Sequence, residues 1–166
     1  MAIAKDSRLI SIIGQIFGSN SKAYYLYRST SIFKNSDISS KTIWHQDMMY
    51  WKGKPNKLTV WISLNKANKQ NGCPKYIPGS QNKSYKHNDI GGDKIPYLEA
   101  QDINDSQKVI TEVEIGDIII HGPYVLHGSE ENVSGEQRYA IIFTYQPTTD
   151  NSHHRSGPPE LIKVKV

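Results

Sequence analysis

The feature that most constrains this chain is its division, after residue 22, into short apolar or aromatic runs separated by turn signals. Glycine, proline, asparagine and serine punctuate these runs, and no helical pattern lies between them, which is typical of antiparallel strands rather than of alternating strands and helices. We therefore predict a mainly β fold, either a sandwich or a barrel, with the jelly roll among the candidates. The predicted strands are residues 23–27, 42–50, 57–64, 75–77, 109–113, 117–121, 125–129 and 138–145.

One amphipathic helix is predicted before the strands, over residues 6–17, with Asp6 as its cap and Gly18 as its stop. A chain of 166 residues has room for one domain, 1–166, with a barrel over about 23–146 and an irregular C-terminal tail. Residues 81–107 are rich in Asn, Asp, Lys and Gly and show no strand pattern, so we expect a long loop over a binding site there.

The composition excludes several classes of protein. The single cysteine, Cys73, excludes an internal disulfide framework and a zinc site built from several thiolates, and it is typical of a cytoplasmic protein. No run approaches the roughly 18 apolar residues of a membrane span. The net charge of +4 comes from lysines that are interspersed with acids, which argues against a nucleic-acid partner. Nothing in the sequence indicates an oligomeric state.

Metal-binding residues are predicted in the strand over 42–50, where His45 and Asp47 would lie side by side on one face. His127 is the best third ligand, and two histidines with one carboxylate form the ligand set of non-haem Fe(II) oxygenases. A second His-x-Asp pattern begins at His87, in a polar loop without an apolar framework, so we do not expect it to bind a metal. His121 is expected to be packed or hydrogen-bonded rather than a ligand.

The segment after His127 predicts a further binding residue, independently of the metal ligands. If the residues after His127 close as a hairpin, Arg138 lies opposite His127 on the neighbouring strand, facing the same side. The planar guanidinium of arginine suits a carboxylate, so a dicarboxylate cosubstrate could be held by Arg138 at one end and by the metal at the other. Ser129 shares that face and could donate a further hydrogen bond.

These residues, in this order, resemble the phytanoyl-CoA dioxygenase family of Fe(II)/2-oxoglutarate oxygenases, over about residues 23–145. Members carry a longer helical region before the barrel than the one helix predicted here. The motifs that carry the resemblance are Trp44-His45-Gln46-Asp47, Trp61-Ile62-Ser63-Leu64, Gln70-Asn71-Gly72-Cys73, Ile77-Pro78-Gly79-Ser80, Gly116-Asp117, His121, Leu126-His127-Gly128-Ser129, Asn132 and Arg138.

The resemblance implies a double-stranded β-helix of the cupin-like jelly-roll type, with Fe(II) held by His45, Asp47 and His127. It implies 2-oxoglutarate and O2 as cosubstrates and no catalytic residue beyond the metal ligands. The residues implied in binding 2-oxoglutarate are Arg138, Ser129, Trp61 and Arg28.

A small molecule is the expected substrate, hydroxylated with release of succinate and CO2, and Met49 and Trp51 are candidates for contacting it. Because Asp47 occupies the position that a halide would need, hydroxylation is favoured over halogenation. Two alternatives stay open. One is a cupin-like metal enzyme of another class, which would not need Arg138, and the other is an inactive barrel that serves as a binding module.

Overall fold

The computed structural model describes residues 2–18, 23–37, 41–91, 98–154 and 158–163. In this part of the chain no helix is long and apolar enough to cross a membrane. The elements are η1 (Ile3–Lys5), α1 (Ser7–Phe17), β1 (Ala23–Lys34), β2 (Thr42–His45), η2 (Asp47–Tyr50), β3 (Leu58–Ser63), β4 (Pro74–Tyr76), η3 (Ser80–Asn82), β5 (His87–Asp89), β6 (Leu98–Ala100), η4 (Asp105–Gln107), β7 (Val109–Ile110), β8 (Ile118–His121), β9 (His127–Ser129), β10 (Arg138–Pro147) and β11 (Glu160–Lys163).

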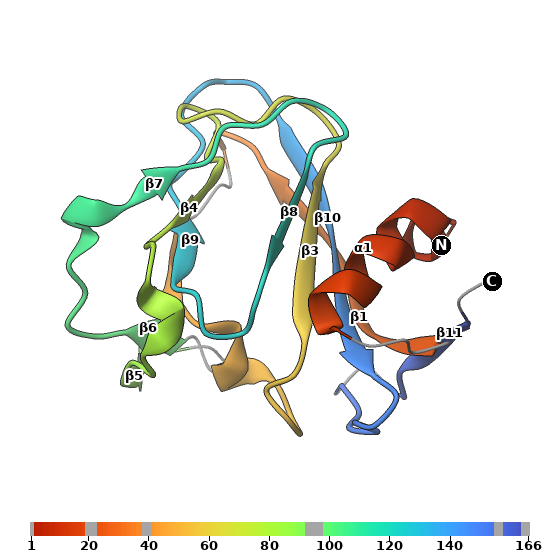
Figure 1. Cartoon of the computed structure of the whole chain (residues 1–166). Coiled ribbons are helices and arrows are strands. Elements are labelled where there is room, and N and C mark those ends of the chain that lie inside the picture. Colours follow the sequence, from red (N-terminus) through yellow and green to blue (C-terminus); the bar gives the residue numbers. More distant parts are fainter. Residues whose placement is uncertain (1, 19–22, 38–40, 92–97, 155–157, 164–166) are drawn as a thin grey trace.

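Two antiparallel sheets form the body of the fold (Figure 1). The larger has the strand order β11-β1-β10-β3-β8 and the smaller has the order β2-β9-β4-β7, while β5 and β6 form a separate two-stranded sheet. This arrangement confirms the predicted mainly β jelly roll with one N-terminal helix.

The predicted helix is confirmed within one residue. Asp6 caps α1 by accepting a hydrogen bond from the backbone N–H of Arg8, and Gly18 ends the helix in the left-handed conformation that glycine adopts without strain. The helix covers the outer face of the larger sheet (Figure 1). Its buried residues pack there against apolar side chains of β1, β3, β10 and β11.

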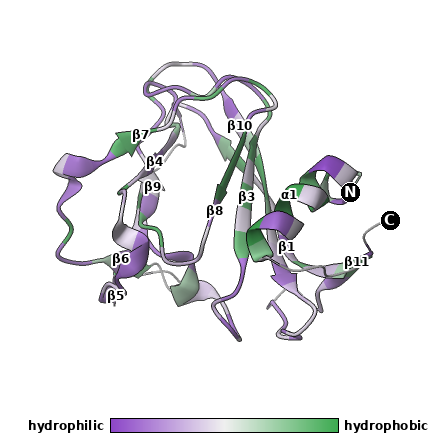
Figure 2. Cartoon of the chain, in the orientation of Figure 1, coloured by the Kyte–Doolittle hydropathy of each residue, from purple (hydrophilic) through white to green (hydrophobic). Residues whose placement is uncertain are grey.

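The larger sheet is covered on both faces, and this is why every residue of β3 is buried. Leu58, Val60 and Ile62 face α1, whereas the alternate residues Thr59 and Trp61 face a cavity between the two sheets. Hydrophobic residues are accordingly concentrated in α1, β3 and β8, while the segment around β5 and β6 is largely hydrophilic (Figure 2).

Two predicted features of the backbone are wrong. The strand predicted over 42–50 stops at His45, because the N–H of Met49 bonds to the carbonyl of Gln46 and the N–H of Met48 to that of Pro123, which makes a 3-10 turn instead. The stretch 81–107 is not strandless, since it contains β5 and β6, although residues 92–97 lie outside the described residues. The described part of the predicted irregular tail, residues 148–154 and 158–159, holds no strand, but the sequence did not predict β11, which follows it and pairs with β1.

The hairpin predicted between His127 and Arg138 is also wrong. β9 pairs with β2 and β4, whereas β10 pairs with β1 and β3, so the chain crosses from one sheet to the other between residues 129 and 138. His127 and Arg138 therefore approach the cavity from its two opposite walls. Cys73 is buried among apolar side chains.

Candidate metal centre

His45 and His127 lie directly opposite each other on β2 and β9, with ring centroids 4.2 Å apart. The strands come this close because Gly128 has no Cβ, and a Cβ there would lie 2.6 Å from the carbonyl oxygen of Thr42. Each ring places Nδ1 at hydrogen-bond distance from a backbone carbonyl two residues earlier, 2.9 Å from Ile43 and 3.0 Å from Val125. A carbonyl only accepts, so Nδ1 carries the proton and Nε2 keeps a free lone pair.

Asp47 completes the group from the first turn of η2. The extended backbone of Gln46 keeps Asp47 on the same side as His45. The two side chains therefore lie side by side as predicted, although the strand ends at His45. Oδ1 of Asp47 lies 3.8 Å from Nε2 of His45 and 3.8 Å from Nε2 of His127. Its other oxygen, Oδ2, accepts a hydrogen bond of 2.7 Å from the hydroxyl of Thr59. One ligand atom from each of the three residues lies within 4.8 Å of the others.

The charge state of this group suits a divalent cation. Burial lowers the pKa of His45 and of His127 to about 4, so both imidazoles are neutral at neutral pH. Burial acts in the opposite direction on Asp47, but the neighbouring histidines and the hydrogen bond from Thr59 outweigh it, and the pKa of Asp47 lies below its ordinary value. Two neutral imidazoles and one carboxylate are the donors that bind Fe(II) while leaving further positions open.

A cavity of about 240 Å³ lies beside these side chains, between the two sheets. It brings together most of the residues predicted for the site, whereas Met49 does not line it and is 41% exposed. The predicted residues that line the cavity are His45, Asp47, His127, Arg138, Ser129, Trp61, Arg28 and Trp51.

Arg138 is the most deeply buried cation of the cavity wall. It is 2% exposed, and its guanidinium carbon lies 5.5 Å from the ring centroid of Trp61. Within the described residues, its Nε is the one buried side-chain polar atom without a hydrogen-bond partner. Burial lowers the pKa of Arg138 to about 10, which leaves the guanidinium charged at neutral pH. A buried cation with an unused donor is a site for an anion.

His121 was expected to be packed or hydrogen-bonded, and its Nδ1 lies 3.2 Å from the carbonyl of Gly122. Its ring also lies 4.4 Å from that of His127 and forms part of the cavity wall, as does Tyr76, whose ring stacks on that of His127 with centroids 5.9 Å apart. Sequence reasoning missed Tyr76 and Thr59. The signal for Thr59 was its place two residues before Trp61 on a strand, which puts both side chains on one face.

The β5–β6 sheet is fastened directly to the segment that carries His45 and Asp47. The side-chain amide of Gln46 donates to the backbone carbonyls of Lys83 and Tyr124 and accepts from the backbone N–H of Tyr85. The backbone N–H of Gln46 donates to Nε2 of His87 at 3.1 Å. His87 is therefore held by hydrogen bonds, contrary to the expectation of a polar loop without a framework. These contacts hold β5 and the residues before it against the segment between His45 and Asp47.

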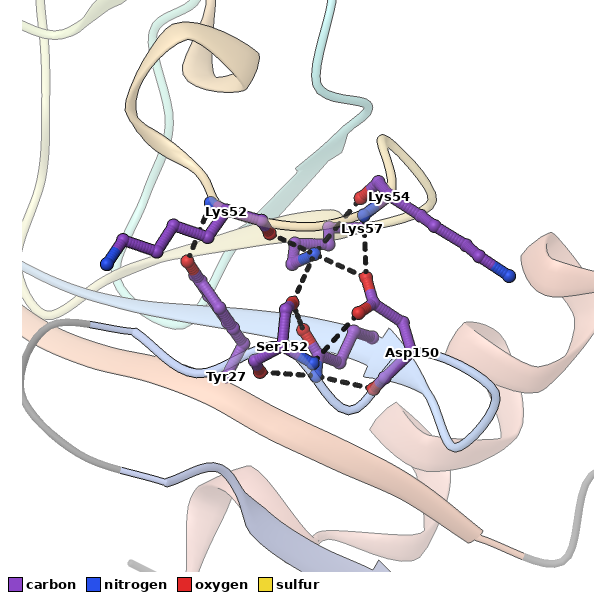
Figure 3. Close-up of polar contacts among 7 residues, drawn as sticks. Tyr27, Lys52, Lys54, Lys57, Asp150 and Ser152 are labelled. Atoms are coloured by element: carbon purple, nitrogen blue, oxygen red, sulfur yellow. Dashed lines mark hydrogen bonds and ion pairs between the residues drawn. The ribbon is translucent and has the colours of Figure 1, made fainter.

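A buried ion pair fastens the loop that follows Trp51 (Figure 3). Nζ of Lys57 donates to Oδ2 of Asp150 at 2.7 Å and to the carbonyls of Lys52 and Lys54, each at 3.0 Å. Burial raises the pKa of Asp150, but hydrogen bonds, first of all from Lys57, outweigh it and lower the value to about 2. The charged pair thus ties the loop after Trp51 to the segment that follows β10.

Comparison with known proteins identifies relatives of this chain. Residues 2–140 match the family described as Phytanoyl-CoA dioxygenase (PhyH). The L-proline trans-4-hydroxylase of Streptomyces griseoviridis is 23% identical over 93% of this chain and 65% of its own, and phytanoyl-CoA dioxygenase 1 of Oryza sativa subsp. japonica is 33% identical over 69% and 42%. The chain thus spans less than two thirds of the length of these relatives.

Solved structures show the same fold. EvdO2 from Micromonospora carbonacea var. aurantiaca, crystallised with 2-oxoglutarate, has a TM-score of 0.75 at 22% identity, covering 86% of this chain and 59% of its own. The α-ketoglutarate-dependent epimerase SnoN from nogalamycin biosynthesis has a TM-score of 0.69 at 20% identity, covering 91% and 57%. The match over residues 2–140 shows that the chain belongs to the phytanoyl-CoA dioxygenase (PhyH) family.

Proposed function

We propose that this chain is an Fe(II)- and 2-oxoglutarate-dependent dioxygenase that hydroxylates a small molecule. The observation that carries the proposal is the meeting, in one cavity, of a His-Asp-His group with a buried arginine that has an unused donor. The His-Asp-His group fits a divalent metal, and the buried arginine fits a carboxylate. 2-Oxoglutarate is a cosubstrate that needs a metal at one end and a cation at the other.

His45, Asp47 and His127 would hold the metal. Their fit rests on the donor set, because both Nε2 lone pairs are kept free by the Nδ1 contacts and Oδ1 of Asp47 faces both rings. When bound, Fe(II) would activate O2, with 2-oxoglutarate supplying two electrons and the substrate C–H bond supplying two, so that one oxygen atom ends in the hydroxylated substrate and the other in succinate, with release of CO2. The protein's own part is to orient the ligands and to exclude water.

Arg138 would bind the carboxylate of 2-oxoglutarate that does not reach the metal. Its planar fork can donate two parallel hydrogen bonds, and burial strengthens the ion pair because little solvent screens it. The ring of Trp61 holds the guanidinium from one side. Ser129 lies two residues after His127 on the opposite wall and lines the same cavity, so its hydroxyl would be a further donor to the same anion.

The test is calorimetric titration of 2-oxoglutarate into the protein under anaerobic conditions, with and without Mn²⁺ in place of Fe(II). We expect binding only with the metal, and Arg138→Ala should weaken it about 30-fold or more, since a buried charge pair is lost. Lys52→Gln is the matched control, because it removes an exposed positive charge outside the cavity and should leave the affinity unchanged.

Each failure has its own meaning. Metal binding without 2-oxoglutarate binding would indicate a cupin-like metal enzyme of another class, and binding of neither would indicate an inactive barrel. Where both bind, succinate formation stimulated by members of a metabolite panel then tests the hydroxylation itself.

A further inference from the structure

Arg28 is a second cation in the cavity wall, and the proposed cosubstrate leaves it unused. It lies on β1, is half-buried, and donates from Nε to the hydroxyl of Thr30 at 2.8 Å. Among the described residues, no carboxylate forms an ion pair with it. Its remaining guanidinium donors are thus available to a bound molecule.

Arg28 and Arg138 lie at different levels of the larger sheet. Arg28 pairs with Thr144 on β10, and Thr144 in turn pairs with Thr59 on β3, the residue that bonds Asp47. Arg28 therefore belongs to the row of residues next to the metal group. Arg138 lies six positions before Thr144 on β10, and its guanidinium carbon lies 5.5 Å from the ring centroid of Trp61, two residues after Thr59 on β3.

Arg28 lines the cavity together with His45 and Asp47. It does so from β1, whereas Arg138 lines the same cavity from the start of β10. The two guanidinium groups thus reach the cavity from different positions of the larger sheet.

The charges in the loaded cavity point to the occupant. Asp47 is the only carboxylate among the described residues that line it. A divalent metal, the charge of Arg138, the carboxylate of Asp47 and the two charges of 2-oxoglutarate cancel, with both imidazoles neutral. The charge of Arg28 is left over, and a partly dehydrated cation is stabilised by an anion that reaches it.

We propose that Arg28 binds a carboxylate of the primary substrate, so that the substrate class is small carboxylic acids. The assignment rests on the proposed function, and it differs from the role in binding 2-oxoglutarate that the family resemblance implied for Arg28. Trp51, 7% exposed, supplies an apolar wall of the same cavity for the body of the acid.

The experiment uses two probes of equal shape and different charge, propionate and propionamide. Each is titrated into the full chain saturated with Mn²⁺ and 2-oxoglutarate under anaerobic conditions, and enhanced proton relaxation near Mn²⁺ reports both the affinity and the distance of the probe from the metal. We expect propionate to bind about tenfold or more tightly than propionamide in the wild-type protein, as for a hydrogen bond to a charged group.

Arg28→Gln should abolish this preference, Arg28→Lys should keep part of it, and the control Lys52→Gln should keep all of it. The affinities of Arg28→Gln for Mn²⁺ and for 2-oxoglutarate show that the variant is folded and that its cosubstrate site is intact. Equal binding of the two probes to the wild-type protein would overturn the proposal, as would propionate binding that survives Arg28→Gln.

A third result would also overturn it: loss of 2-oxoglutarate affinity in Arg28→Gln as large as in Arg138→Ala, which would assign Arg28 to the cosubstrate. Failure of the proposed function is separate, because it appears as absence of metal-dependent 2-oxoglutarate binding in the wild-type protein before any propionate is added.

Discussion

The hydroxyl of Thr59 fixes the rotation of the Asp47 carboxylate, and removing it should weaken metal binding. Thr59 donates to Oδ2 at 2.7 Å, a distance typical of a strong hydrogen bond to a charged oxygen, and this leaves Oδ1 facing both histidines at 3.8 Å. Thr59→Val keeps the shape of the side chain and deletes only the donor. Asp47 then loses the contact that decides which of its oxygens faces the metal position.

The expected loss of metal affinity follows from the kind of hydrogen bond that is removed. A hydrogen bond to a charged group contributes about 1.5–3 kcal/mol, and changes to the groups that orient metal ligands typically cost about 10–100-fold in metal affinity. Because the carboxylate is only 15% exposed, little water can replace the lost donor. We therefore expect Thr59→Val to weaken Mn²⁺ binding by about tenfold or more, measured by calorimetry on the metal-free protein.

Two variants make the result specific. Thr59→Ser restores the hydroxyl and should recover most of the affinity. Thr144→Val removes a hydroxyl from the neighbouring position on β10, which lines the same cavity but makes no hydrogen bond to Asp47, and should leave the affinity unchanged. If Thr59→Val bound Mn²⁺ as tightly as the wild-type protein, or if Thr144→Val weakened binding equally, the positioning role of Thr59 would be refuted.

Three further outcomes are expected. Lys57→Met should lower the free energy of unfolding by about 3–5 kcal/mol in urea, because it strands the buried charge of Asp150, and a loss below 1 kcal/mol would contradict this. Gln46→Ala should speed hydrogen exchange of the backbone amides in β5 and β6, and unchanged exchange would show that the amide does not fasten them. In the metal-free protein, His45 and His127 bind fewer protons when folded than when unfolded between about pH 4 and 6.5, so the free energy of unfolding should fall as the pH is lowered through that range; a flat urea midpoint there would refute it.

Local sequence patterns predicted the elements whose stability is local. The helix over Ser7–Phe17 has its own cap, stop and apolar face, and β3, β8 and β10 of the larger sheet carry alternating or continuous apolar residues, so these elements were found. The 3-10 turn η2 was missed because Met48, Met49 and Tyr50 have the composition of a strand. What bends the chain there is a hydrogen bond to Pro123, far away in the sequence.

The β5–β6 sheet was missed for a related reason. Its six residues show no apolar alternation, and the contacts that hold it come from Gln46 and from Tyr50, whose hydroxyl accepts from the N–H of Leu98 at 2.8 Å. No local pattern encodes such contacts, because both partners are polar and lie some 40 residues or more from the strands they fix. Tertiary hydrogen bonds decide the structure of this segment.

Arg138 shows what a pattern of alternation can and cannot settle. Alternation along a strand predicts which side chains share a face, but it does not say which sheet the strand joins. Arg138 was placed beside His127 on a neighbouring strand, yet the two come from facing sheets and meet because both face the enclosed cavity. Thr59 and Arg28 also lie on inward positions of the larger sheet, where Thr59 bonds Asp47 and Arg28 lies beside the metal group. The three proposed metal ligands come from β2, from the turn that follows it and from β9, on the side of the smaller sheet. The chemistry of the site is therefore divided between the walls: one supplies the metal ligands, and the other supplies the groups that position Asp47 and bind anions.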